Sequence, residues 1–160
     1  MSIPSSDAWP PRSEEQLDRA AKNGVLKENH TMDIKRELKG GDSGNREIAK
    51  DIAAFSVEGG LIFIGVDEDT TPPSLHPVKL DGLTERIEQV GLSRVDDPVL
   101  VTTIEIQSTT DPTHGFLVVE VPVSSQAPHM ADGKYYSRGD TTRNCQDLWI
   151  EVLSGDLRSG

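Results

Sequence analysis

The stretch from Leu61 to Val66 constrains the fold more than any other part of the sequence. It is apolar throughout, with Gly65 inside it, it is rich in β-branched residues, and two glycines precede it at positions 59 and 60. Such a run is typical of a strand that is buried on both faces, so it belongs in the middle of a sheet with packed layers on each side. The run is far shorter than the roughly 20 residues that cross a bilayer, so the sequence predicts no membrane span.

The segments around this strand alternate between helical and extended patterns. Ser13 to Gln16 have the pattern of a capping box at the start of a helix. From His30 to Leu38, apolar and charged residues alternate with a period of two, as in a strand. Asp111 to Gly115 form a turn signal between two extended runs. The predicted elements, in chain order, are a helix over 13–22, a strand over 30–38, a helix that Asn45 caps and that ends at Phe55, the strand over 61–66, a helix over 81–92, strands over 99–107, 116–123 and 134–138, a loop over 139–144 and a helix over 146–153.

This order of elements predicts an α/β fold, in which a single domain has a mixed β-sheet flanked by helices. A length of 160 residues fits one domain. We expect the proline-containing residues 1–12 to form a flexible N-terminal arm, residues 13–153 to form the domain and residues 154–160 to form a flexible tail.

The cysteine and histidine content excludes several classes of protein. Cys145 is the only cysteine, so no internal disulfide can form, and the four histidines show no pairing at the spacing of zinc ligands. The N-terminal residues lack the basic start and the apolar stretch of a signal peptide. We therefore expect a cytoplasmic protein without a disulfide or zinc scaffold, in which Cys145 is chemically inert.

Charge is distributed unevenly along the chain. The net charge is -11, which would repel polyanions if it were spread evenly, but residues 51–133 alone carry 14 acidic and 3 basic groups. Two short segments, residues 35–50 and 134–143, can form a cationic face that binds nucleic acid on an acidic body. The alternative is that these basic residues are ordinary solvated charges.

Three carboxylates are candidates for a metal site. Glu28 and Asp33 stand at the start of the first predicted strand, and Asp67 follows the central strand. If these two strands are neighbours, the three side chains converge on a hard divalent ion such as Mg²⁺ or Mn²⁺, which supports phosphodiester hydrolysis. Lys35 lies on the same strand face as Asp33, where it can hold a phosphate. The alternative is an ion-paired or solvated strand face, with Asp67 in a simple turn.

Two other segments have the composition of phosphate-binding segments. Residues 39–45 are glycine-rich and run into a helix, whose free N–H groups can bind phosphate; an ordinary capping loop is the alternative. Residues 135–143 place aromatic side chains beside guanidinium groups and hydroxyls, which can stack a base and bind a phosphate. If this segment is a strand, either Tyr135 or Tyr136 faces the core. His129 is a proton donor, a phosphate contact or a plain surface residue.

Three blocks of the sequence stand in the order found in a known family. They are Asp33-Ile34-Lys35, the block from Ile52 to Glu68 with its Gly-Gly, apolar and Gly-Val-Asp pattern, and Tyr135-Tyr136-Ser137-Arg138-Gly139-Asp140-Thr141-Thr142. Over about residues 28–143 the chain resembles the Alba-like domain of the Schlafen family, which occurs in bacterial proteins often labelled as ATP-binding or DNA-binding regulators.

The resemblance implies an α/β domain that binds nucleic acid. The nuclease members of the family cleave structured RNA such as tRNA with Mg²⁺ or Mn²⁺, through three carboxylates at positions that match Glu28, Asp33 and Asp67. Nuclease members also pair two such lobes into a cradle, so the resemblance implies that a single lobe needs either a homodimer or an added domain to complete one.

The leading expectation is a nucleic-acid-binding domain that is directed at RNA more than at DNA. The side chains expected to contact nucleic acid are Lys35, Arg36, Lys39, Lys134, Tyr136, Arg138, Arg143 and His129. One alternative is a Mg²⁺- or Mn²⁺-dependent endoribonuclease that acts on tRNA-like RNA through Glu28, Asp33 and Asp67. A further alternative is an ATP-sensing or protein-interaction module that uses the loop over residues 40–45.

Overall fold

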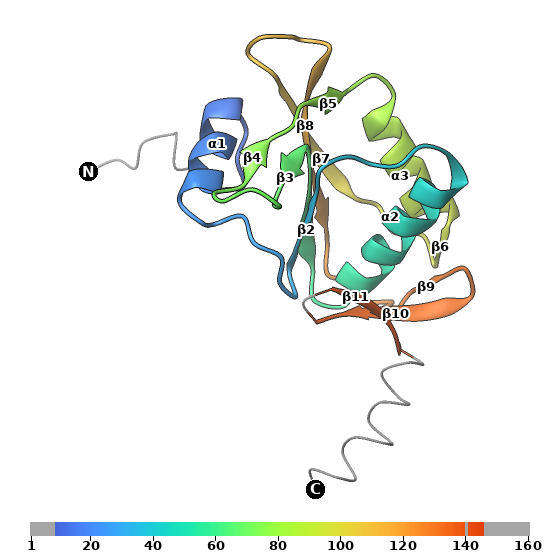
Figure 1. The fold of residues 1–160 in the computed structure, drawn as a ribbon. Coiled ribbons are helices and arrows are strands. Elements are labelled where there is room, and N and C mark those ends of the chain that lie inside the picture. Colours follow the sequence, from blue (N-terminus) through green and yellow to red (C-terminus); the bar gives the residue numbers. More distant parts are fainter. Residues whose placement is uncertain (1–8, 140, 146–160) are drawn as a thin grey trace, which may run out of the picture.

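The computed structural model describes residues 9–139 and 141–145, without the side chains of residues 143 and 144. As the sequence predicts, the fold is mixed α/β, with helices on both sides of a sheet (Figure 1). The predicted helix over 146–153, the predicted tail and the first eight residues of the predicted arm lie outside the described residues. In chain order the elements are α1 (Glu14–Lys22), β1 (Met32–Lys35), α2 (Gly41–Phe55), β2 (Gly60–Ile64), β3 (Val66–Asp67), β4 (Ser74–Leu75), β5 (Val78–Lys79), α3 (Leu83–Ser93), β6 (Val95–Asp96), β7 (Thr102–Gln107), β8 (His114–Val121), β9 (Met130–Ala131), β10 (Lys134–Arg138) and β11 (Thr142–Asn144).

The main sheet is built around β2, which contains most of the apolar run. β1 pairs in parallel with one edge of β2, with Asp33 opposite Ile62, and β8 pairs antiparallel with the other edge. β7 pairs antiparallel with β8 as the predicted hairpin, and the short β5 pairs with the start of β8. The predicted central position of β2 is confirmed, because this strand is hydrogen-bonded along both edges.

Two smaller sheets complete the fold. β11, β10, β9 and β6 form an antiparallel sheet in that order, and it lies beside α2 (Figure 1). β3 and β4 form a short antiparallel pair directly after Gly65. Gly65 has a φ of 107°, and a Cβ atom there would lie 2.7 Å from the ring of Phe116, so the change from β2 to β3 requires glycine.

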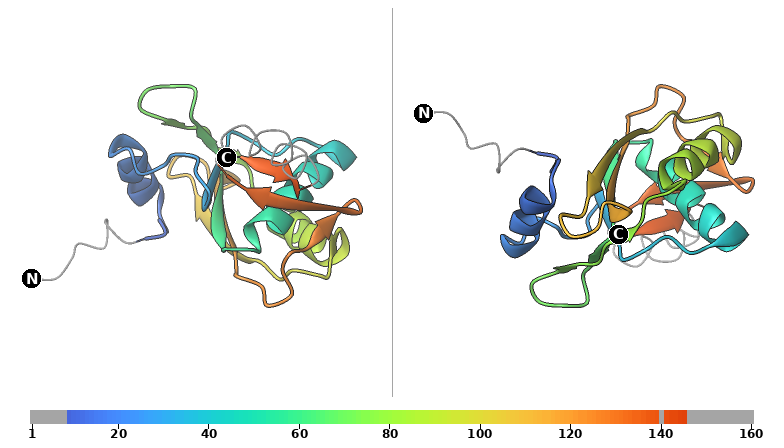
Figure 2. Two further views of the ribbon diagram at one scale, coloured as in Figure 1. Left: turned by 90° about the horizontal axis from the view of Figure 1, so that it is seen from below. Right: turned by 90° about the horizontal axis from the view of Figure 1, so that it is seen from above.

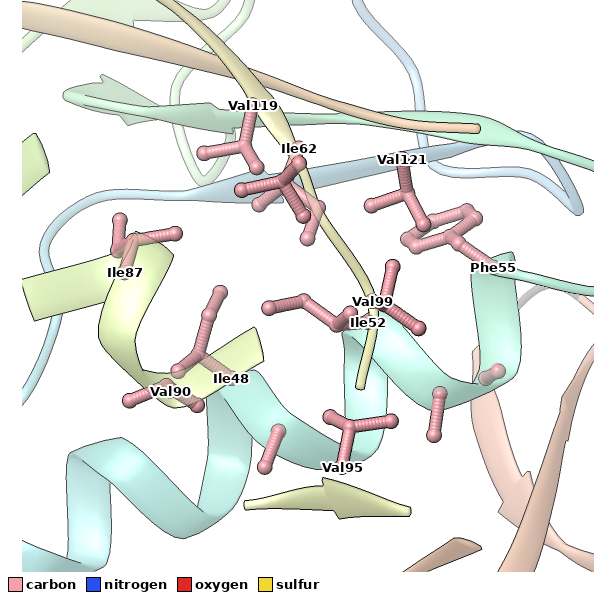
Figure 3. Close-up of a cluster of buried hydrophobic side chains, with 14 of the residues drawn as sticks. Ile48, Ile52, Phe55, Ile62, Ile87, Val90, Val95, Val99, Val119 and Val121 are labelled. Atoms are coloured by element: carbon pink, nitrogen blue, oxygen red, sulfur yellow. The ribbon is translucent and has the colours of Figure 1, made fainter. Parts of the chain in front are cut away.

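Apolar side chains fill the space on both faces of the main sheet. On one face α2 and α3 pack against β2 and β8 through a cluster that includes Ile48, Ile52, Ile87 and Val119 (Figure 3). On the other face α1 packs through Leu17, and Figure 2 shows the strands between α1 and the other two helices. The main sheet is therefore the middle layer of three.

Several local predictions are confirmed. The hydroxyl of Ser13 accepts a hydrogen bond of 3.2 Å from the backbone N–H of Gln16, so this serine caps α1. The turn between β7 and β8 is closed by Asp111, whose carboxylate accepts a 2.9 Å hydrogen bond from the N–H of Thr113. β10 has the predicted bounds. Within residues 9–139 and 141–145, no helix is long and apolar enough to cross a membrane.

Three predicted boundaries are wrong. α2 begins at Gly41 with Gly40 as its N-cap, because Gly44 packs so closely on Lys39 that the glycine segment forms the first turn of the helix. Asn45 therefore lies inside α2 and caps nothing. The first strand is shorter than predicted and spans β1 alone, and the predicted polar loop over 139–144 contains β11, which pairs with β10. Its alternating polar residues carry no apolar signal that would have indicated a strand.

Candidate functional site

A buried lysine organises the polar residues between β1 and α2. The ammonium of Lys35 lies 3.0 Å from Asp33, 2.9 Å from Asp51 and 3.0 Å from Glu47. Its side chain is only 11% exposed, and those of Asp33 and Asp51 are each 8% exposed. We call Lys35 and these three carboxylates the lysine cluster.

β10 and β11 close the lysine cluster from a third side. Arg138 lies 3.8 Å from Asp33, stacks 4.5 Å above the ring of Phe55 and donates hydrogen bonds of 2.9 and 3.0 Å to the carbonyls of Asn29 and Met32. The hydroxyl of Thr142 donates a 2.6 Å hydrogen bond to Asp51. β10 and β11, which are distant in sequence, are therefore joined to the consecutive elements β1 and α2 at one buried polar site.

Two buried cations balance two buried carboxylates in this site. Burial lowers the pKa of Lys35, but the charges of Asp51 and Asp33 outweigh that effect and raise its pKa above the ordinary value, so the ammonium stays charged. Burial raises the pKa of Asp33 and of Asp51, and Lys35 only partly offsets the rise. The two carboxylates compete for one ammonium, and the half-exposed Glu47 adds further negative charge at the surface.

Of the three carboxylates predicted to share a metal ion, Glu28 and Asp33 lie in contact, whereas Asp67 makes its hydrogen bond within its own turn. Glu28 contacts Asp33; burial is the main cause of the raised pKa of Asp33, Lys35 opposes the rise, and the contact with Glu28 adds to it. Asp67 instead closes its own turn, because its carboxylate accepts a 3.0 Å hydrogen bond from the N–H of Asp69. Glu68 is the acid of this turn that contacts Glu28. Burial raises the pKa of Glu68, and the negative charges of Asp33, Asp69 and Asp67 raise it further, whereas the contact with Glu28 lowers it.

The arrangement of the acids is not that of a preformed metal site. In the described part of the chain, no three aspartate, glutamate, histidine or cysteine side chains are placed to hold an ion together. The ammonium of Lys35 occupies the space between Asp33 and Asp51. Carboxylate oxygens are the ligands that Mg²⁺ and Mn²⁺ prefer. In their described positions, however, Glu28, Asp33 and Asp67 do not form a site for such an ion, and we derive no reaction step from it.

A cleft of about 410 Å³ opens over the lysine cluster. Asp33, Lys35, Asp51 and Arg138 line it from β1, α2 and β10, and Glu28 lines it beside Asp33. Two further cations, Arg36 and Lys39, also line the cleft, are exposed, and form no ion pair within the described residues. We call Arg36 and Lys39 the rim cations. The cleft thus combines paired buried charges with two exposed cations and with the acids Glu28, Glu37 and Glu47.

Lys134, Tyr136 and His129, the other predicted contacts whose side chains are described, do not line this cleft. Lys134 is exposed on β10, and the side chain of Arg143 is outside the described residues. Tyr136 is 7% exposed and Tyr135 is 44% exposed, which confirms that one of this pair faces the core. The ammonium of Lys50 lies 5.6 Å from the ring centre of Tyr136.

His129 is the most deeply buried of the predicted contacts. The alternative that it is a plain surface residue is wrong, since only 2% of it is exposed. Its Nδ1 lies 2.6 Å from the carbonyl oxygen of Asp97, and its Nε2 lies 2.6 Å from the hydroxyl of Ser124. His129 and Tyr136 therefore lie inside the fold, where they support β9 and β10 and face no open surface.

The predicted phosphate loop forms the first turn of α2 and carries a negative charge. Asp42 in this turn pairs with Arg94 at 2.5 Å and with Arg46 at 3.0 Å. These arginine contacts lower the pKa of Asp42, so its carboxylate stays ionised. An anion at this helix end meets a fixed carboxylate, and the capping-loop alternative describes the segment better.

Four residues of the site escaped the sequence analysis: Glu47, Asp51, Thr142 and Glu68. Glu47 and Asp51 are four residues apart, so they lie on the same face of α2, and that spacing was the available signal. Nothing in the sequence shows that this polar face turns toward Lys35. Thr142 could not be assigned because the strand that carries it was predicted as a loop.

A comparison with protein families identifies the matched region. The family model described as Schlafen, AlbA_2 matches residues 28–145 of the chain. This range includes every residue of the lysine cluster and both rim cations. No curated protein matches the chain.

Proposed function

Because the chain belongs to the Schlafen AlbA_2 family, we propose that it is a nucleic-acid-binding domain whose ligand is RNA. The family suggests a function related to nucleic acid, and the cleft over the lysine cluster is where we place the contact. The observation that carries the proposal is the position of Arg36 and Lys39, which are exposed at this cleft without ion-pair partners among the described residues.

The buried charges explain how an acidic chain can attract a phosphate at this point. Without Lys35 and Arg138, the carboxylates of Asp33 and Asp51 would present two negative charges under the cleft. The two buried cations offset these charges at short range, so Arg36 and Lys39 remain as the exposed cations that a phosphate can reach, although Glu28, Glu37 and Glu47 also line the cleft. In this proposal the rim cations contact phosphates, and Lys35 and Arg138 position the cleft without releasing their own partners.

The acids in the same cleft favour RNA over DNA. Glu28, Glu37 and Glu47 line the cleft and offer acceptor oxygens. The 2′-hydroxyl of ribose can donate a hydrogen bond to such an oxygen, and deoxyribose lacks this donor. A phosphate at the rim cations would place the adjoining sugar toward these acceptors.

Fluorescence anisotropy with labelled single-stranded RNA, and with DNA of the same sequence, tests the proposal. We expect tighter binding to RNA, with log K falling linearly as log salt rises. Arg36→Ala and Lys39→Ala should each reduce the slope by about 0.7, the value for one phosphate on a single strand. Lys22→Ala on α1 is the control, because it removes one exposed positive charge on the other side of the sheet, where Lys22 pairs with Asp18 at 2.7 Å.

Two results would contradict the proposal. Binding that does not change with salt would exclude phosphate contacts as its source. An effect of Lys22→Ala as large as that of the rim variants would show that only the overall charge of the chain is measured.

A second candidate function is a Mg²⁺- or Mn²⁺-dependent endoribonuclease acting on tRNA-like RNA; the contact between Glu28 and Asp33 in the cleft favours it, whereas the described acids form no preformed ion site. Incubation of tRNA with the protein and Mn²⁺ tests it, with Glu28→Gln and Asp67→Asn as variants. Both variants remove a charge from a partly exposed position, so neither should unfold the domain. Cleavage that depends on Glu28 would support this function, and cleavage that persists in both variants would remove these acids from the reaction.

A further inference from the structure

A second cleft lies on the other side of the segment that carries the rim cations. It has a volume of about 370 Å³ and is lined by residues from β5, from the start of α3 and from the start of β8. Glu37 lines both clefts, so the backbone of residues 36–39 forms the wall between them. We call this space the histidine cleft.

Basic side chains outnumber acidic ones around the histidine cleft. Four basic residues line it, and the two acidic residues that line it are Glu37 and Asp81; the basic ones are His76, Lys79, Arg86 and His114. This composition is unusual in the chain, because Lys79 and Arg86 are two of only three lysine or arginine residues in the acidic segment 51–133. Lys79 forms no ion pair, and the ring of His76 has no hydrogen-bond partner, among the residues that the structure describes.

Two of these basic groups face each other across a strand pair. Lys79 of β5 and His114 of β8 are direct partners in antiparallel register. Side chains at such positions stand close together on one face, and like charges there repel each other. An anion between them would offset the repulsion whenever the histidine carries a proton.

The ring of His114 is oriented so that one nitrogen remains for a ligand. The hydroxyl of Thr113 donates its hydrogen to Asp111 at 2.6 Å, so its oxygen can only accept from Nδ1 of His114, which lies 2.9 Å away. Asp111 also lies 3.1 Å from the same nitrogen. Nδ1 therefore carries a hydrogen, and a second proton on the ring would make Nε2 a donor. Nε2 has no hydrogen-bond partner within residues 9–139 and 141–145.

Arg86 connects the histidine cleft to the rim cations. Its guanidinium donates hydrogen bonds of 2.5 Å to the carbonyl of Lys39, 3.3 Å to that of Gly41 and 2.7 Å to the side chain of Asn45. The backbone that carries Lys39 is thus fastened to α3, which forms part of the histidine cleft. The two clefts are consequently held in a fixed relation, with Lys39 at their boundary.

From this arrangement we infer that the histidine cleft binds a phosphate group between Lys79, His76 and His114. This inference rests on the proposed function for its source of phosphate, because it assigns that phosphate to the backbone of an RNA strand that also contacts Arg36 and Lys39. A free phosphate compound has the same chemistry, and the experiment separates the two sources.

NMR spectra of the imidazole groups, recorded with increasing pyrophosphate at about pH 6, test the site itself. We expect the ring signals of His76 and His114 to shift in a saturable way while those of His30 and the buried His129 stay in place. Lys79→Ala should weaken this response several-fold, and Lys22→Ala should leave it unchanged. RNA binding by the same variants, measured by anisotropy on one oligonucleotide, tests the source.

Each outcome decides one part of the inference. Shifts of His76 and His114 together with weaker RNA binding and a lower salt slope in Lys79→Ala would support it fully. Shifts without any change in RNA affinity would overturn the assignment to RNA. Absence of shifts would overturn the site, even if RNA binds at the rim cations. Shifts in a protein that does not bind RNA would support the phosphate site, while refuting the proposed function.

Discussion

Replacement of Lys35 by methionine tests whether the lysine cluster depends on this ammonium. Methionine has a similar length and no charge, so Lys35→Met leaves Asp33 and Asp51 buried without their shared partner. Removal of one member of a buried ion pair typically costs about 3–5 kcal/mol. A domain of this kind has only about 5–15 kcal/mol of stability, so the change should be large and easily measured.

Urea denaturation followed by far-ultraviolet circular dichroism provides the measurement. With a slope of about 2 kcal/mol per molar urea, the expected loss lowers the midpoint by about 1.5–2.5 M. Lys39→Met is the matched control, since Lys39 is exposed and should change the free energy of unfolding by less than about 0.5 kcal/mol. A loss below about 1 kcal/mol in Lys35→Met would refute the view that the buried carboxylates need this ammonium.

The pH dependence of the same variant separates charge from packing. Asp33 and Asp51 already have a raised pKa in the folded protein because they are buried. Lys35 opposes that rise, so its removal should raise the pKa of both carboxylates further. A group with a higher pKa in the folded state than in the unfolded state loses stability as pH rises, so Lys35→Met should recover as pH falls from 7 toward 5. The recovery is at most about 1.4 kcal/mol per pH unit for each proton bound. A packing defect alone would give the same deficit at both pH values.

Other predictions concern stability and assembly. Gly44→Ala should cost about 1–3 kcal/mol in thermal unfolding, because a Cβ atom there would lie 1.8 Å from the carbonyl oxygen of Lys39, whereas Gly40→Ala, with open space around it, should cost less. An equal effect of both substitutions would refute the close packing. His129→Gln should cost about 1–3 kcal/mol in urea denaturation by disturbing its contacts with Asp97 and the Ser124 hydroxyl, and a neutral result would contradict that role. The homodimer predicted from the family resemblance should appear in sedimentation velocity as a species of twice the monomer mass, and a monomer at all concentrations with RNA present would contradict it.

The fold followed from local patterns wherever burial produced a clear periodicity. The run from Leu61 to Val66 is apolar at every position because β2 has a neighbour on each edge and a packed layer on each face. β11 shows the opposite case, since it pairs with β10 but its polar sequence resembles a loop. The N-terminus of α2 was misplaced because close packing of Gly44 on Lys39 overrides the weak helix propensity of glycine.

Only part of the candidate site could be predicted from the sequence. Asp33 and Lys35 could be assigned to one strand face by their spacing of two, and the ion-paired alternative is confirmed by their 3.0 Å contact. Burial of that face was not foreseen, because charged residues in alternation normally indicate a solvated surface. The partner that makes burial tolerable is Asp51, which is distant in sequence and reaches Lys35 only through packing of α2 on the sheet. Long-range pairing of this type leaves no local pattern.

The charge balance around the lysine cluster bears on the proposed binding of RNA, because the chain has a net charge of -11. At physiological salt, charges separated by more than about 8 Å are largely screened, so the acidic excess of residues 51–133 acts mainly on its own surroundings. Near the cleft, Lys35 and Arg138 together offset the charge of the buried carboxylates, and in the proposed function the rim cations act on the ligand. Lower salt lengthens the range of the distant acids and of the rim cations alike. Because repulsion by the distant acids also grows at low salt, the slope of log K against log salt should be smaller than the slope expected from the number of phosphates in contact. In a variant with fewer acids on the remote face of the domain, the slope should approach that expected value.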